Sequence, residues 1–217
     1  MKKVQTIKNI EGILLHSKEA GNGNRIVFIF TKNYGNQTAF VSQSTIKSFG
    51  SGLLMPFTYL RCSMAETSFD KWTLIQYEGK NICDISKFSY EDWCRWCFVI
   101  EIIKWGFPLG EKDINAYIRL VKCLKGILDK NKQVSAYITA LQMLYAAGYD
   151  ASAQEMCELY NLSDESKTLL QKFINYSWEK PMGINISKEM LKEIALYLDK
   201  FVKSVCDMEL KSKKMFI

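Results

Sequence analysis

The stretch that decides the fold is EGILLHSK at residues 11–18, followed after a short Gly/Asn turn by NRIVFIFTKNYG at residues 24–35. Both segments are rich in β-branched and aromatic residues and are bounded by turn residues, which is typical of two neighbouring strands. The same pattern continues to residue 78, and the predicted strands are 7–17, 25–31, 37–43, 54–65 and 69–78. Five short strands within roughly 80 residues predict a small barrel of the OB type.

After about residue 85 the hydrophobic period changes to that of helices. Serines that can cap helix N-termini stand at positions 89, 163 and 187. The predicted helices are 89–106, 111–129, 133–147, 151–160, 163–176 and 187–205. We therefore expect an α+β protein of two domains, with an OB-fold domain at 1–85 as the candidate nucleic-acid-binding part. The all-helical domain at 86–217 is then the candidate partner-binding part.

Composition narrows the class of protein. Of the 217 residues 48% are hydrophobic, which indicates a folded chain with a sizeable core. The net charge of +6 permits an anionic partner without requiring one. The seven scattered cysteines favour reduced thiols over a disulfide framework. Glu11 interrupts the apolar run that a secretion signal would need, and the most apolar segment, 93–105, is too short and too charged to span a bilayer. A cytoplasmic protein without a membrane partner is expected.

Several segments of the chain resemble the RecO family of bacterial recombination mediators. Near the start these are residues 11–15, residues 25–35 and the Leu-x-Pro-Phe motif at 54–57; further on they are Leu-x-x-x-Gly-Tyr at 144–149 and LKSKKMF at 210–216. RecO proteins place an N-terminal OB-fold before a helical domain, in the order expected here. The resemblance therefore implies a protein of DNA repair and homologous recombination that is located in the bacterial cytoplasm, in association with the nucleoid.

The resemblance also implies an activity and partners. A RecO-like mediator is not an enzyme: it binds single- and double-stranded DNA, anneals complementary strands and assists RecA loading. It does so together with RecR and with single-strand binding protein, whose C-terminal tail binds the helical domain. An alternative is a protein-interaction scaffold of the same fold with little DNA affinity.

Two departures from the family pattern bear on these expectations. RecO proteins continue after the third strand with a basic run, whereas the segment 42–48 here reads SQSTIKS and retains one lysine. Fewer phosphate contacts would weaken the affinity of the barrel for nucleic acid. Many relatives also carry a four-cysteine zinc site after the Gly-Tyr motif, but only Cys157 stands in that region, and Tyr160 takes the place three residues on. One thiolate cannot form a tetrahedral site, so we expect no metal and no other cofactor.

Nucleic-acid binding by such a barrel needs cations interleaved with exposed rings, on which bases stack. In the barrel, Lys47 lies beside Phe49 in one turn, and Lys71 lies beside Trp72 in a later strand; the alternative is that Phe49 and Trp72 belong to the core. In the helix 111–129, Lys112, Asn115, Arg119 and Lys122 share one side, which is equally typical of a solvated helix face. The candidate binding residues are Lys32, Tyr34, Lys47, Arg61, Lys71, Arg119 and Lys122.

No catalytic constellation competes with this interpretation. Cys94 and Cys97 form a Cys-x-x-Cys pair, but they fall inside a predicted helix among aromatic residues, which favours core packing over half of a metal site or a redox pair. A thiol-active enzyme using these two residues is nevertheless a third hypothesis. His16, the single histidine, has no nucleophile pattern to serve as its partner. The chain also lacks a glycine-rich phosphate loop, so we expect no ATP hydrolysis.

Overall fold

A computed structural model describes residues 6–68, 71–127, 131–179, 183, 185–207 and 209–212, without the side chains of 6–9, 67, 68 and 71. Parts of three predictions lie outside these residues: positions 69–70 of the fifth strand, 128–129 of the second helix, and 213–216 of the tail segment. The chain forms two compact units, one of Met1–Ser86 with Phe107–Leu124 and one of Lys87–Gly106 with Lys125–Ile217. The two units therefore interleave along the chain, and the division into an OB-fold domain at 1–85 and a helical domain at 86–217 stays a prediction.

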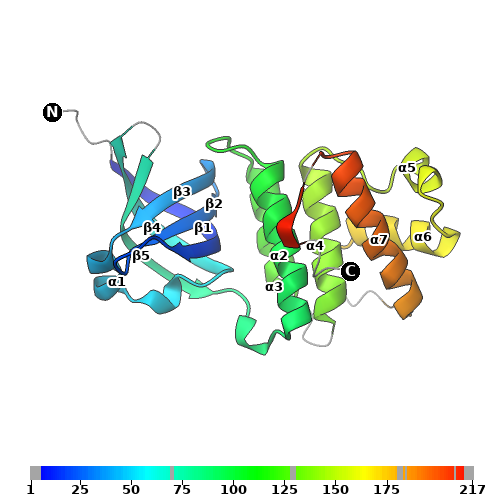
Figure 1. The fold of residues 1–217 in the computed structure, drawn as a ribbon, viewed down its shortest axis with the longest axis horizontal. Helices are drawn as coiled ribbons and strands as arrows, with labels where there is room; N and C mark the ends of the chain where they lie inside the picture. Colours follow the sequence, from blue (N-terminus) through cyan, green and yellow to red (C-terminus); the bar gives the residue numbers. More distant parts are fainter. Residues whose placement is uncertain are drawn as a thin grey trace. The chain divides into compact units, whose positions relative to one another are not determined.

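The first unit is built on a closed five-stranded barrel (Figure 1). Around the barrel the order is β1-β2-β3-β5-β4, and all neighbours are antiparallel except β3 and β5. This order, with a helix between β3 and β4, is that of an OB-fold and confirms the predicted fold class. The strands are β1 (Thr6–Glu19), β2 (Arg25–Thr31), β3 (Gly35–Val41), β4 (Thr58–Ser68) and β5 (Lys71–Asn81).

Alternate strand residues fill the barrel, as the period of two requires. The inward-facing side chains form one cluster, against which Trp72 packs from its rim. Gly12 is in close contact with β2, because a Cβ added there would overlap the Ile29 side chain. The buried members of the cluster are Ile10, Leu14, Val27, Ile29, Ala39, Val41, Leu54, Leu60, Cys62, Met64, Leu74 and Tyr77.

The segment between β3 and β4 differs from the prediction. The third strand ends at Val41, because Ser42 caps a short helix, α1 (Gln43–Phe49), by accepting a hydrogen bond from Thr45 N at 3.1 Å. A 3₁₀ turn, η1 (Ser51–Leu53), follows. The fourth strand begins at Thr58 and not at residue 54, since Phe57 adopts a left-handed φ of 63° that an extended strand does not accommodate.

The segment Phe107–Leu124 completes the first unit by covering part of the barrel's outer face. Phe30 points outward from β2, and its ring contacts those of Phe107 (5.2 Å) and Tyr117 (6.3 Å). The Asn36 side chain donates to Phe107 O at 2.6 Å, and Asn36 O accepts from Gly110 N at 3.1 Å. Sequence elements far apart are thus joined into one unit. Tyr117 belongs to α3 (Ile114–Lys125).

The second unit is helical, and three of its helices begin at the serines that the sequence predicts as caps, whereas the helix predicted at 151–160 begins at Gln154 and not at residue 151. The Ser89, Ser163 and Ser187 side chains each accept the expected cap bond, from Asp92 N (3.1 Å), Ser166 N (3.3 Å) and Met190 N (3.1 Å). The helices of this unit are α2 (Tyr90–Gly106), α4 (Lys132–Ala146), α5 (Gln154–Leu159), α6 (Asp164–Ile174) and α7 (Lys188–Ser204), and a 3₁₀ turn, η2 (Ile85–Lys87), precedes them. No helix within the described ranges is long and apolar enough to cross a membrane.

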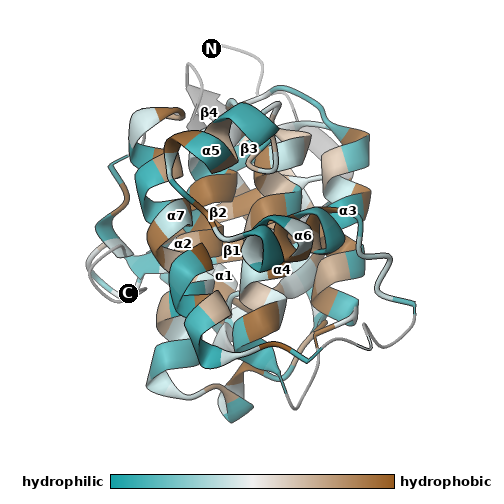
Figure 2. Ribbon diagram, turned by 90° about the vertical axis from the view of Figure 1, so that its right-hand side faces the viewer, coloured by the Kyte–Doolittle hydropathy of each residue, from teal (hydrophilic) through white to brown (hydrophobic). Residues whose placement is uncertain are grey.

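Helix α4 is the centre of the helical unit. Every residue from 134 to 144 is buried, and α4 packs against α2 and α6. Figure 2 shows the hydrophobic colouring of α4 behind the mainly hydrophilic α6. A helix buried on all sides needs partners for its polar side chains. The Thr139 hydroxyl accordingly donates to Ser135 O at 2.8 Å.

Gln142 is the other polar residue at the centre of α4, and it is 3% exposed. Its amide nitrogen is within hydrogen-bond distance of three carbonyls at and just after the end of α6: those of Phe173 (3.0 Å), Ile174 (3.2 Å) and Tyr176 (2.8 Å). Its amide oxygen accepts from Trp178 Nε1 at 3.0 Å. One side chain thereby fixes the chain that leaves α6 onto α4.

Candidate nucleic-acid interface

The seven predicted binding residues all belong to the first unit. Lys32 and Tyr34 lie in the β2–β3 hairpin, and Arg61 lies on β4. Lys47 is exposed in the last turn of α1. The side chain of Lys71, the first residue of β5, lies outside the described part of the chain. The remaining two, Arg119 and Lys122, are on α3.

Lys32 and Arg61 converge on one carboxylate. Glu11, between them on β1, lies 3.3 Å from Lys32 Nζ and 3.7 Å from Arg61 Nε. The hydrogen bond from Lys32 holds the pKa of Glu11 below its usual range, although partial burial opposes this shift. Glu11 is therefore ionised at neutral pH and neutralises part of the charge that Lys32 and Arg61 offer to a phosphate.

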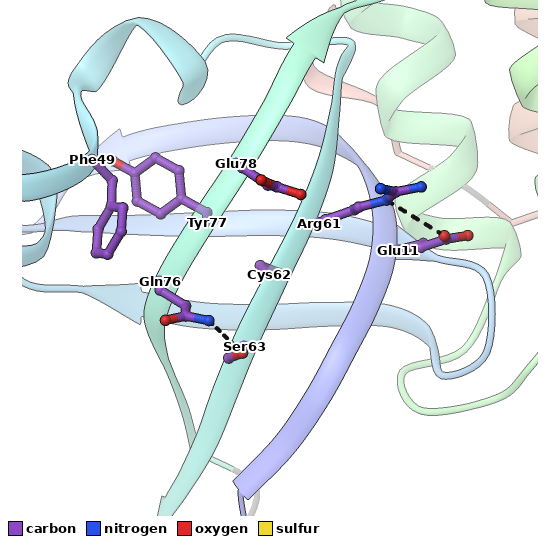
Figure 3. Close-up of a pocket in the computed structure, with 8 residues that line it drawn as sticks. All are labelled: Glu11, Phe49, Arg61, Cys62, Ser63, Gln76, Tyr77 and Glu78. Atoms are coloured by element: carbon purple, nitrogen blue, oxygen red, sulfur yellow. Dashed lines mark hydrogen bonds and ion pairs between the residues drawn. The ribbon is translucent and has the colours of Figure 1, made fainter.

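A surface hollow of about 640 Å³ lies beside this ion-pair cluster (Figure 3). Glu11 and Arg61 line one end, and the rings of Phe49 and Tyr77 line the other. Glu78 is the cross-strand neighbour of Arg61. The hollow is therefore mixed in charge and is not a continuous positive groove. Its other lining residues are Cys62, Ser63 and Gln76.

The two rings that sequence analysis placed beside cations differ in their surroundings. Trp72 packs against the barrel core, as the alternative interpretation predicted. Phe49 does not belong to the core: it is 41% exposed, and its ring centroid is 5.5 Å from that of Tyr77. The Tyr77 hydroxyl donates to Gly50 O at 2.7 Å and fixes the end of α1 on the barrel. Phe49 and Lys47 thus share an exposed helix end.

The basic side of α3 is shorter than the sequence pattern suggests. The helix begins at Ile114 because Asp113 accepts a hydrogen bond from Ala116 N at 2.8 Å and so caps it, which leaves Lys112 outside the helix. Lys122 is exposed and Arg119 is half-buried. Ile118 is 45% exposed, while Leu120 and Cys123 are buried. α3 therefore keeps two cations near an exposed apolar side chain.

Sequence analysis missed another set of outward side chains on the barrel. His16 and Phe28 stack with centroids 5.9 Å apart, and Lys18 Nζ lies 5.9 Å from the centre of the Phe28 ring. Phe40, on the next strand, is 38% exposed. The signal was present in β2, where Val27 and Ile29 face the core and Phe28 between them must face outward. We call His16, Lys18, Phe28 and Phe40 the ring face.

The cysteine pair has the properties of packed side chains. Cys94 is buried and Cys97 is half-buried, both within α2. Burial raises the pKa of Cys97 to about 11, with Cys94 and Glu101 adding to the rise. Cys97 therefore stays a protonated thiol near neutral pH, whereas a reactive cysteine needs a depressed pKa. Within the described ranges, no three His, Cys, Asp or Glu side chains gather as a possible metal site. The absence of a bound metal stays a prediction.

The fold of the first unit indicates the class of protein. A closed five-stranded barrel with a helix after its third strand is an OB-fold, and OB-folds bind oligonucleotides or oligosaccharides. Residues 1–76 match the family model described as Recombination protein O N terminal. This part of the chain is therefore similar to the N-terminal domain of RecO proteins, as the sequence resemblance indicated. A search of the curated proteins found no match.

Proposed function

We propose that the protein is a RecO-like recombination and repair mediator, which binds single- and double-stranded DNA and anneals complementary strands. It would assist RecA loading together with RecR and single-strand binding protein, in the bacterial cytoplasm at the nucleoid. The observation that carries the proposal is the similarity of residues 1–76 to the RecO N-terminal domain, together with the closed OB-type barrel. The seven candidate binding residues belong to the same compact unit, which supports it further.

The mechanism needs no covalent chemistry. Cations on the first unit would neutralise phosphate charge and so reduce the repulsion between two strands brought together. The helical unit would bind the tail of single-strand binding protein. In support, Trp105 and Tyr145 are 44% and 47% exposed on α2 and α4, and the Trp105 ring lies 6.2 Å from that of Tyr149. Exposed aromatic side chains are common anchors for peptide partners.

Fluorescence anisotropy of labelled oligonucleotides over a salt series tests the proposal. We expect affinity to fall as salt rises, with a slope of about 0.7 for each phosphate contacted on a single strand. Duplex of the same length should bind with a steeper slope, since its phosphate density is higher. An affinity that does not change with salt concentration would contradict a mechanism based on phosphate contacts.

Glu11→Gln should strengthen DNA binding. The substitution removes the carboxylate that pairs with Lys32 and Arg61 and frees both cations for phosphate. We expect a gain of about twofold to fivefold, since an exposed ion pair contributes about 0.2–1 kcal/mol. Titration of Glu11→Gln and the wild type with the same oligonucleotide measures it. Glu66→Gln on β4 is the matched control for the change in net charge, and an equal gain in that variant would show that the pairing itself is unimportant.

The alternative hypothesis, a protein-interaction scaffold with little DNA affinity, is also based on the surface of the barrel. Segment 42–48 carries a single lysine and forms the cap and most of α1, and two of the candidate cations are paired with Glu11. A protein with this surface would contact RecR or the tail of single-strand binding protein while holding DNA weakly. Co-purification with either partner, combined with no DNA binding at low salt, would favour the scaffold over the mediator.

A further inference from the structure

The ring face (His16, Lys18, Phe28 and Phe40) is continuous across three strands. His16 of β1 is the register partner of Phe28 on β2, and Lys18 is the partner of Ile26. Ile26 is in turn the partner of Phe40 on β3. Ile26 and Phe28 are half-buried, and the other three side chains are exposed. Rings and a cation therefore occupy neighbouring positions on one outward surface.

These rings do not fill the interior of the barrel. The residues that alternate with them, Val27, Ile29, Ala39 and Val41, are completely or almost completely buried and fill the interior. At the other end of β2, the outward Phe30 is covered by Phe107 and Tyr117. The ring face shares the outer side of the same strand but stays exposed. Its apolar surface is therefore open to a partner.

The chemistry of the face favours a flat, anionic ligand. The stacked pair of His16 and Phe28 has an interplanar angle of 24°, so the two rings present nearly parallel planes. Lys18 lies over the Phe28 ring within cation–π distance, where it can contact a phosphate next to a stacked base. Among the described side chains of the face there is no carboxylate. Unpaired bases offer flat aromatic faces next to phosphates, whereas a duplex hides the faces of its bases.

We propose that the ring face is a stacking site for unpaired bases, so that this barrel prefers single-stranded DNA to duplex. The inference rests on the proposed function, because it takes DNA as the ligand, and it adds the part of DNA that is recognised. Bases stack on the exposed rings of Phe40 and His16, while Lys18 contacts the backbone. Stacking of this kind is independent of base sequence.

A comparison of two ligands tests the inference with the full-length chain. One is a fluorescent oligothymidine; the other is an abasic strand of the same length, which keeps the phosphates and lacks the bases. The wild type should bind oligothymidine more tightly by about fivefold to a hundredfold, the range that corresponds to one stacked base. Equal affinity for the two strands would overturn the stacking site and leave phosphate binding intact. If neither strand bound, the proposed function would fail together with the stacking site.

Variants of Phe40 test whether its ring is the stacking surface, and Phe40 is chosen because it is more exposed than Phe28. Phe40→Ala and Phe40→Leu should both lose the preference for oligothymidine, since neither has a ring, and Phe40→Trp should keep it. The dependence on salt should stay unchanged in all three, because no phosphate contact is removed. Ile75→Ala is the matched control, since Ile75 is an apolar side chain on β5 that is 44% exposed. A loss in Ile75→Ala equal to that in Phe40→Ala, or a preference retained in Phe40→Leu, would contradict the proposal.

Discussion

Replacing Gln142 by leucine should destabilise the helical unit by about 3 kcal/mol, one of the largest effects expected from a single substitution here. The amide nitrogen of Gln142 contacts the carbonyls of residues 173, 174 and 176, and its oxygen accepts from Trp178. Leucine fills similar space but leaves these groups without their partner in a buried site. Hydrogen exchange followed by mass spectrometry measures the loss separately for α4, α6 and the barrel strands.

Two further substitutions separate the hydrogen bonds from packing. Trp178→Phe removes the bond to the Gln142 oxygen and part of the indole packing but leaves the three carbonyls with their donor, so it should cost less than Gln142→Leu. Gln142→Glu replaces the donating nitrogen by a carboxylate oxygen that faces three carbonyls, and we expect it to cost more than leucine. If protection in α4 and α6 were the same in Gln142→Leu as in the wild type, the amide would not hold the segment after α6.

The Gln142 contacts are one of the polar links between helices of the helical unit that involve buried or partly buried side chains. The amide joins α4 to the chain after α6, and Glu193 of α7 adds a second polar link by accepting bonds from Ser163 N (2.7 Å) and the Ser166 hydroxyl (2.5 Å). These bonds hold the pKa of Glu193 below its usual value, although burial opposes them.

The sequence predicted the elements whose signals are local. The cap serines at 89, 163 and 187 each mark a helix start, because capping depends only on residues within one turn. The barrel was also predictable, since turn residues separate its strands at short intervals. α1 was not, because Ile46 is its only apolar residue before Phe49 and no helical period can be seen in segment 42–48.

Which residues come together at the site depends on contacts between distant parts of the chain, and no local sequence pattern predicts such contacts. The contact between Phe30 and Phe107 joins residues far apart in the chain, so the sequence could predict α3 but not its place on the barrel. The ring face could not be predicted from the sequence for another reason. The run IVFIF in β2 has no polar residue to mark its outward side, and a register shift between Leu14 and His16 sets which β1 side chains face Phe28.

Gly35→Ala should be the most damaging substitution in the barrel unit. Gly35 has a φ of 60°, which side chains rarely adopt, and an added Cβ would overlap the carbonyl of Glu111. The segment Phe107–Leu124 would have to move away from the barrel and expose Phe30. We expect a loss of about 3 kcal/mol, of which about 1–2 kcal/mol is the left-handed strain. Hydrogen exchange of residues 107–124 would report the displacement directly.

Gly21→Ala provides the control for strain alone. Gly21 also has a positive φ, of 79°, but an added Cβ would meet nothing within 4 Å. The difference between the two variants therefore isolates the contact with Glu111. Displacing this segment should also lower the salt slope of DNA binding, by about 0.7 for each phosphate that Arg119 or Lys122 contacts. If Gly35→Ala unfolded no more easily than Gly21→Ala and kept the wild-type slope, α3 would not be a fixed part of the nucleic-acid-binding unit.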